Sequence, residues 1–163
     1  MNASANNRLS KLSMTSSGFT LIELMVTIAV LAIIVSIAAP NISNQLANQR
    51  VKSTTATLVN ALKEAKVESV IRRQKVELSY DNNGNNAGEI ELEDESSTFA
   101  TYRYDAKSTI KSVDDDDEIE FKPNKTAEEM TFTICDSNTN ASPRQVAISA
   151  IGVITTQLGG TCP

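Results

Sequence analysis

Histidine and tryptophan are absent from this 163-residue chain, and aromatic residues make up only 4% of it. Without histidine, the chain lacks the most common general base and the most common metal ligand of proteins. Basic residues are also few, 15 against 20 acidic ones, which gives a net charge of −5. A general nucleic-acid coat would need the opposite balance. We therefore expect no catalytic residue, no metal or other cofactor site, and no nucleic acid as a partner.

Cysteine is scarce as well, and the two cysteines, Cys135 and Cys162, lie late in the chain. They are too far apart in sequence to form a CxxC metal or redox pair. Distant cysteines in an exported protein are typically joined in a disulfide. The closed loop of about 28 residues would stabilise the fold by about 3.5 kcal/mol in the chain-entropy model. The alternative is a pair of buried free thiols.

Charge is nearly missing from residues 19–39, FTLIELMVTIAVLAIIVSIAA, where Glu23 is the one charged side chain. As a helix this segment would be about 31 Å long, which matches a bilayer core of about 30 Å. A secretory signal peptide has a shorter apolar core followed by a small-residue cleavage site. Here the small residue, Gly18, precedes the apolar run, so we expect the membrane segment to be kept. Residues 1–18 are a short leader that carries two basic residues, Arg8 and Lys11, and no acid.

An amphipathic pattern follows the apolar run. Spacings of four, three, four and three residues place one stripe on a helix, formed by Val51, Thr55, Leu58, Leu62 and Ala65. We predict one long helix from about Thr20 to about Arg73. The ring of Pro40 should bend it, because proline removes a helix hydrogen bond and crowds the preceding turn.

The period changes to two in residues 76–163, which predicts short strands separated by turns. The expected strands cover residues 76–80, 89–94, 98–105, 118–122, 130–135, 145–149 and 152–156. The predicted fold is α+β, with the amphipathic half of the helix packed on an antiparallel β-sheet. The predicted organisation is a leader (1–18), a transmembrane and assembly helix (19–40) and a soluble head (41–163), in which helix 41–73 precedes the β-rich part.

The residues GFTLIE, from Gly18 to Glu23, follow a short cationic leader and precede the apolar run and Pro40. This arrangement resembles the processing site of the type IV pilin-like superfamily, which includes pilins, minor pilins and secretion-system pseudopilins. The resemblance implies that a prepilin peptidase cuts between Gly18 and Phe19 and methylates the new Phe19 amine. The alternative is an ordinary membrane anchor that is not processed.

An acid inside an apolar helix costs free energy in lipid and needs a partner. The resemblance implies that Glu23 pairs with the Phe19 amine, either in its own subunit or in a neighbour, and so acts in assembly. The alternative role is structural, because Thr20 and Glu23 also fit a capping box, S/T-x-x-E.

The layout of long helix, β-rich remainder and late strands around ISAIGVITT resembles the GspH/FimT group, most closely the FimU-type minor pilins. The implied function is that of a minor pilin in a type IV pilus, at the tip or in the initiating complex. A pseudopilin of a type II secretion system and a DNA-uptake minor pilin are the alternatives. The implied partners are other pilins and minor pilins, the peptidase, and the bacterial inner membrane with its assembly platform. The head would face the periplasm before assembly and lie in the fibre at the cell surface afterwards.

Two features bear on ligands. DNA-binding members of the resembling group carry arginines after a glycine in a late loop, whereas Gly152 is followed here by Val153, Ile154 and Thr155, and the nearest cation in sequence is Arg144. The acidic run at 114–118 lacks the spacing of a calcium loop. A solvated, self-repelling loop is the preferred interpretation, with calcium as the alternative.

Overall fold

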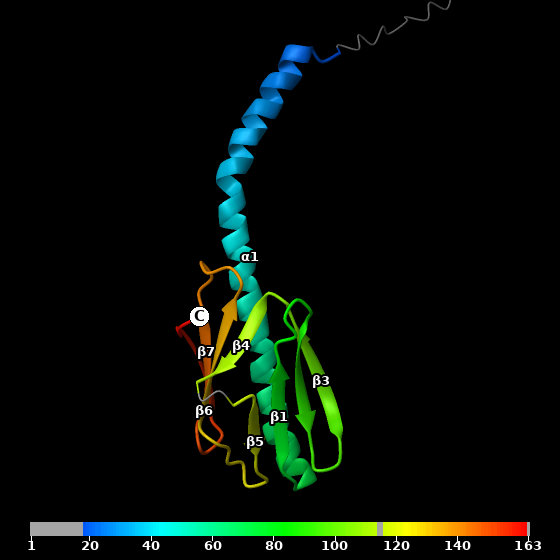
Figure 1. The fold of residues 1–163 in the computed structure, drawn as a ribbon, viewed down its shortest axis with the longest axis vertical. Helices are drawn as coiled ribbons and strands as arrows, with labels where there is room; N and C mark the ends of the chain where they lie inside the picture. The colour runs from blue at the N-terminus through cyan, green and yellow to red at the C-terminus, as the bar shows by residue number, and fades with distance from the viewer. Residues whose placement is uncertain (1–17, 114–115, 163) are drawn as a thin grey trace, which may run out of the picture. The chain divides into compact units, whose positions relative to one another are not determined.

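The computed structural model describes residues 18–113 and 116–162. One long helix is followed by eight strands (Figure 1). Their bounds are α1 Leu21–Arg72, β1 Val76–Asp81, β2 Gly88–Glu93, β3 Thr98–Tyr104, β4 Ser108–Ser112, β5 Glu118–Phe121, β6 Met130–Asp136, β7 Arg144–Ile148 and β8 Ile154–Leu158. The chain divides into two compact units, and the boundary falls between Ala38 and Ala39, within α1.

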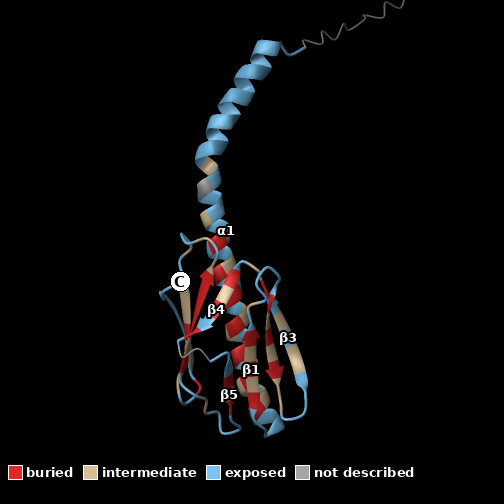
Figure 2. Ribbon diagram, in the orientation of Figure 1, coloured by how far each residue is buried: buried red, intermediate tan, exposed pale blue. Residues whose placement is uncertain are grey.

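In the first unit, α1 presents apolar side chains all round. Each large apolar residue from Leu21 to Ile37 is at least half exposed (Figure 2). In the part of the chain that the structure describes, α1 is the one helix long and apolar enough to cross a membrane. A helix that is apolar on every side is typical of a segment buried in lipid or in a bundle.

The second unit packs the remainder of α1 against two antiparallel four-stranded sheets, with strand orders β3-β2-β1-β5 and β4-β6-β7-β8. The predicted class, a long helix on antiparallel strands, is therefore confirmed. The prediction of one sheet was wrong. The two sheets are linked by hydrogen bonds from the backbone of β4 to two side chains at the end of β1, those of Tyr80 and Asn82. The Tyr80 hydroxyl accepts from Ser112 N at 3.0 Å, and Asn82 Oδ1 accepts from Ile110 N at 2.8 Å.

Strand β4 was not expected, although the seven predicted strands occur with ends shifted by at most two residues. Its sequence, STIKS, contains a single apolar residue, Ile110. Ser108, Ile110 and Ser112 lie on the same face of the strand, which faces inward, and all three are buried. Alternation of this kind is invisible to a hydrophobic pattern when serine occupies the buried positions.

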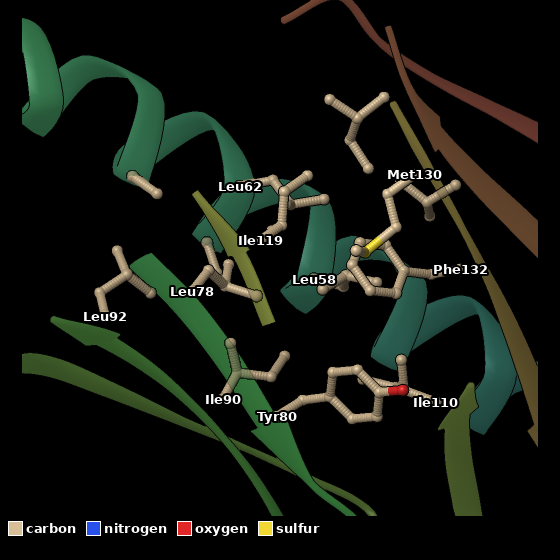
Figure 3. Packing of buried hydrophobic residues seen from close by; sticks show 14 of the residues in the cluster. Leu58, Leu62, Leu78, Tyr80, Ile90, Leu92, Ile110, Ile119, Met130 and Phe132 are labelled. Atoms are coloured by element: carbon tan, nitrogen blue, oxygen red, sulfur yellow. The ribbon is translucent and has the colours of Figure 1, made fainter. Parts of the chain in front are cut away.

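The core lies between α1 and the inner faces of both sheets (Figure 3). All five residues of the predicted helical stripe are buried, and Leu58 and Leu62 are fully enclosed. The sheets contribute Leu78, Ile119 and Phe132 to the same cluster. The polar member of the stripe, Thr55, donates its hydroxyl to the Val51 carbonyl at 2.7 Å, which satisfies it inside the core.

Candidate processing and assembly site

The start of α1 is capped by a side chain of the GFTLIE motif. Thr20 Oγ1 accepts from Glu23 N at 3.3 Å, and the Thr20 carbonyl accepts from Leu24 N at 3.2 Å. The first bond satisfies an N–H group that has no partner inside the helix, as an N-cap does, and the second is the first regular helix bond. Within the described residues, the Glu23 carboxylate accepts no hydrogen bond, so the reciprocal half of the capping box is not formed. The acid is thus left available for another partner.

The peptide bond between Gly18 and Phe19 lies in exposed, non-helical chain just before α1. The Phe19 side chain is 77% exposed. A Cβ added to Gly18 would meet no heavy atom within 4 Å, so nothing in the described chain obstructs access to this bond. The predicted cleavage, the methylation of Phe19 and its pairing with Glu23 stay predictions, because the amine is still part of a peptide bond here.

Two further predictions about the N-terminal segment stay open. Leader residues 1–17 lie outside the described residues. Helix α1 continues through Pro40, whose side chain also lies outside the description, so the expected bend and the role of Pro40 in assembly remain predictions.

The tail of the chain is fixed by a disulfide. Cys135, near the end of β6, is bonded to Cys162, which follows β8. Cys135 is only 4% exposed. The described chain contains no free cysteine. The bond therefore joins the C-terminal residues to a central strand of the second sheet.

An ion pair that the sequence did not reveal joins α1 to the same region. Arg50 donates from Nε and Nη2 to Oδ2 and Oδ1 of Asp136, each at 2.8 Å. The Asp136 side chain is fully enclosed, whereas that of Arg50 is 22% exposed. Burial has the largest single effect and raises the pKa of Asp136. The hydrogen bonds from Arg50 and Asn138 N, together with the charges of Arg50 and Lys107, outweigh it, so the net pKa is lowered. An isolated arginine 86 positions away gives no signal in the sequence.

Three cations lie close together in sequence at the end of α1, namely Arg72, Arg73 and Lys75, and two of them are paired with carboxylates. Arg72 donates to Glu68 at 2.7 Å and to Asp94 at 2.8 Å, and its guanidinium lies 4.1 Å from the Phe99 ring centre. Lys75 donates to Glu120 at 2.9 Å. Cations paired with carboxylates on their own chain present little net positive charge to a phosphate backbone.

A cation on α1 contacts the late loop, although the two are far apart in sequence. Lys66 of α1 donates from Nζ to the Gly152 carbonyl at 2.7 Å. The cation that contacts this glycine in space is therefore Lys66, whereas the nearest cation along the sequence is Arg144. Gly152 has φ +66, and a Cβ there would lie 2.5 Å from the Lys125 carbonyl oxygen. Glycine is therefore required by the turn itself, which gives it a structural reason independent of any ligand.

The acidic run is described only in part, because residues 114 and 115 lie outside the description. Within residues 18–113 and 116–162, no group of three potential metal-ligating side chains comes together. The calcium alternative therefore gains no structural observation in its favour.

Comparisons with known proteins address the motif and the fold separately. The prokaryotic N-terminal methylation motif matches residues 13–39. A crystal structure of the type IV minor pilin FimU of Pseudomonas aeruginosa has a TM-score of 0.53 at 18% identity and covers 73% of this chain and 99% of that one. A second crystal form of FimU gives 0.50 at 19%, covering 74% and 91%. No curated protein sequence gives a significant match.

At these identities the likeness to FimU shows the fold alone. The methylation motif is confined to residues 13–39, so it concerns the N-terminal segment, whereas the likeness to FimU concerns the fold. The chain therefore carries a prokaryotic N-terminal methylation motif ahead of a head that has the type IV pilin fold.

Proposed function

We propose that this chain is a minor pilin of a type IV pilus, cut by prepilin peptidase between Gly18 and Phe19 and methylated on the Phe19 amine. The observation that carries the proposal is the methylation motif at residues 13–39, whose residues from Leu21 onward form an apolar helix exposed on all sides. Such a helix needs an apolar environment at both stages: lipid before assembly, and the helix bundle of the fibre afterwards.

Before assembly, the apolar part of α1 holds the subunit in the bacterial inner membrane, with the head in the periplasm. The head is an independent compact unit with its own core. Its disulfide fits the oxidising periplasm. The partners at this stage are the peptidase, the assembly platform and other pilins.

Assembly moves the helix from lipid into a bundle of similar helices, and this transfer gains little from apolar burial because lipid is already apolar. Glu23 supplies direction to the step: its carboxylate pairs with the Phe19 amine of a neighbouring subunit and sets the axial register. In a medium of low dielectric constant, such a pair is favourable only when both charges are present. The carboxylate without a donor, next to a capped helix start, supports this role.

The experiment has two readouts. Mass spectrometry of the mature N-terminus should find methylated Phe19. Glu23→Ala should leave processing and membrane levels normal but reduce the copies in sheared, purified fibres on the order of tenfold, which corresponds to about 1.4 kcal/mol. Thr20→Ala is the matched control, since it removes the observed cap and keeps the acid.

An N-terminus at Met1 or near Asn41 would refute the processing. Wild-type incorporation of Glu23→Ala would refute the pairing. If Thr20→Ala and Glu23→Ala reduce incorporation equally, Glu23 acts through the helix start instead. Absence of the wild-type chain from purified pili would refute the minor-pilin function itself.

A further inference from the structure

One of the four sheet edges, β4, is closed by the protein's own groups, and a second, β5, is covered at its last residue. On β4, the outward backbone of Ile110 is bound by Asn82, which accepts from its N–H and donates to its carbonyl at 2.7 Å. The outward N–H of Ser112 is bound by the Tyr80 hydroxyl. On β5, Phe121 forms a bridge with Ala127. Proteins commonly cover sheet edges in this way to prevent pairing with other chains.

The third edge, β3, is protected differently. Its pairing with β2 shifts register between Leu92 and Glu93, and it carries Arg103, whose side chain is 75% exposed. Irregular register and charge both discourage the addition of another strand.

The fourth edge, β8, has none of these protections. Ser149 N donates to Val153 O at 3.1 Å, and Gly159 N donates to Pro143 O at 3.0 Å. Hydrogen-bonded pairs alternate along an antiparallel ladder, so the odd-numbered residues of β8 bind β7. The N–H and carbonyl groups of Ile154, Thr156 and Leu158 therefore point outward. They have no partner among the described residues, and we call these three residues the β8 edge.

The β8 edge itself is uncharged and partly apolar, and one cation, Arg144 of β7, lies opposite Leu158. No charged residue occurs between Gln145 and the C-terminus, although 21% of the chain is charged. Large apolar side chains flank the edge and stand exposed: Leu158 at 68%, Ile151 at 69% and Val153 at 47%. Leu158 lies on the same face of the strand as Ile154, which packs on the core. A strand added here would cover Leu158.

We propose that the β8 edge docks an extended, uncharged segment of a different pilin-like subunit, which adds a fifth strand to the sheet β4-β6-β7-β8. Backbone hydrogen bonds would give affinity and alternate apolar side chains specificity, as in strand addition generally. The inference rests on the proposed function, because the partner is a subunit of the same fibre. β3 and β7 lie on opposite sides of the head (Figure 1), and β8 extends the sheet beyond β7.

Charge argues against a second copy of this chain as the occupant. Each copy carries a net charge of −5, and loss of the leader with Arg8 and Lys11 makes the mature chain more acidic. Two such heads repel each other, and the one cation on the neighbouring strand β7, Arg144, offsets little of this repulsion. A partner of different sequence avoids this cost.

The test compares amide hydrogen exchange, resolved to single residues, in the isolated full chain and in purified fibres. In the isolated chain, Thr155 and Gln157 should exchange slowly and the β8 edge rapidly. In fibres, the β8 edge should become as protected as Thr155. This alternation distinguishes strand addition from general shielding. If the edge exchanges equally fast in both states, the inference is overturned.

Two variants test the same edge by incorporation into fibres. Thr156→Pro removes an outward N–H and breaks no bond to β7, and proline is tolerated on edge strands. We expect its copy number to fall on the order of tenfold. Thr156→Val keeps the N–H and the branched shape, and should incorporate normally.

The outcomes separate the two proposals. Normal incorporation of Thr156→Pro overturns the edge inference alone, whereas absence of the wild-type chain from fibres overturns the proposed function. Protection of the edge that appears in the isolated chain as its own concentration rises identifies a second copy as occupant, and overturns the choice made here. Thermal unfolding of the isolated variants controls for misfolding, and if Thr156→Pro does not fold, the exchange measurement on the wild type decides.

Discussion

Removing Arg50 should destabilise the head more than an ordinary ion pair would suggest. Its partner Asp136 is fully enclosed, receives two 2.8 Å hydrogen bonds from Arg50, and has one further donor, Asn138 N at 2.9 Å. Truncation to alanine therefore leaves a buried carboxylate with a single backbone N–H. Loss of one partner of a buried pair costs about 3–5 kcal/mol. Because Arg50 is 22% exposed and water can approach from that side, we expect about 3 kcal/mol.

The cost arises from the charge left behind, and a second substitution should reveal this. Asp136→Asn removes the charge and keeps an acceptor for Asn138. The double variant of Arg50→Ala and Asp136→Asn should therefore lose less stability than the sum of the single variants, by more than about 1 kcal/mol. The Asp105 carboxylate lies 3.8 Å from Arg50 Nε at an exposed position, where ion pairs contribute little, so Asp105→Asn serves as the matched control and should change stability by less than about 1 kcal/mol.

Equilibrium urea unfolding of the oxidised head, followed by circular dichroism, measures all four variants. A loss of less than about 0.5 kcal/mol for Arg50→Ala, the range typical of surface substitutions, would refute the reasoning. So would full additivity of the double variant, because it would mean that the carboxylate is hydrated once the guanidinium is gone.

Three other predictions concern the head. Leu58→Ala should cost about 2–5 kcal/mol, because Leu58 is fully buried, while Leu46→Ala, at a position 55% exposed on the same helix, should lower the melting temperature little. Hydrogen bonds from Ser96 and then from Ser97 and Arg72 lower the pKa of Asp94 from 3.8 to about 2, so the stabilisation from Asp94 is complete above about pH 4 and is lost as the pH falls toward 2. The stability difference between wild type and Asp94→Asn should disappear over that window, and a difference that persists at pH 2 would contradict it. In fluorescence anisotropy at physiological salt, we expect no micromolar, salt-sensitive binding of duplex DNA, because Arg72 and Lys75 are paired within the chain. Binding that is lost when both residues are replaced by alanine would contradict this prediction.

The long helix and most strands were predictable because their signals are periodic and local. The stripe that includes Leu58 and Leu62 needed only the 3.6-residue repeat, and all its members are buried. Turn-forming residues separated the strands clearly enough to fix their ends within two residues. The GFTLIE motif was equally local, because it is part of a short linear motif at residues 13–39.

What the sequence did not reveal depends on contacts between distant residues. The division into two sheets depends on Tyr80 and Asn82, whose side chains occupy the backbone of β4 in place of a ladder. The proximity of Lys66 to Gly152 joins residues 86 positions apart. Neither contact leaves a pattern in a single sequence, because each involves one or two polar residues without a repeat.

Neither of the two proposed assembly contacts should be weakened by salt, and this can be tested. The β8 edge binds through backbone groups and apolar side chains, with no charge between Gln145 and the C-terminus. The pair of Glu23 with the Phe19 amine of a neighbour is charged, but it would lie inside an apolar helix bundle, where screening by salt is weak. Assembled subunits should therefore resist an ionic strength of about 1 M, at which the Debye length of about 3 Å suppresses exposed ion pairs. Quantifying this chain in fibres washed at low and high salt tests the argument. Release at high salt would show that exposed charges on the head hold the subunit, and would count against both contacts as the main source of affinity.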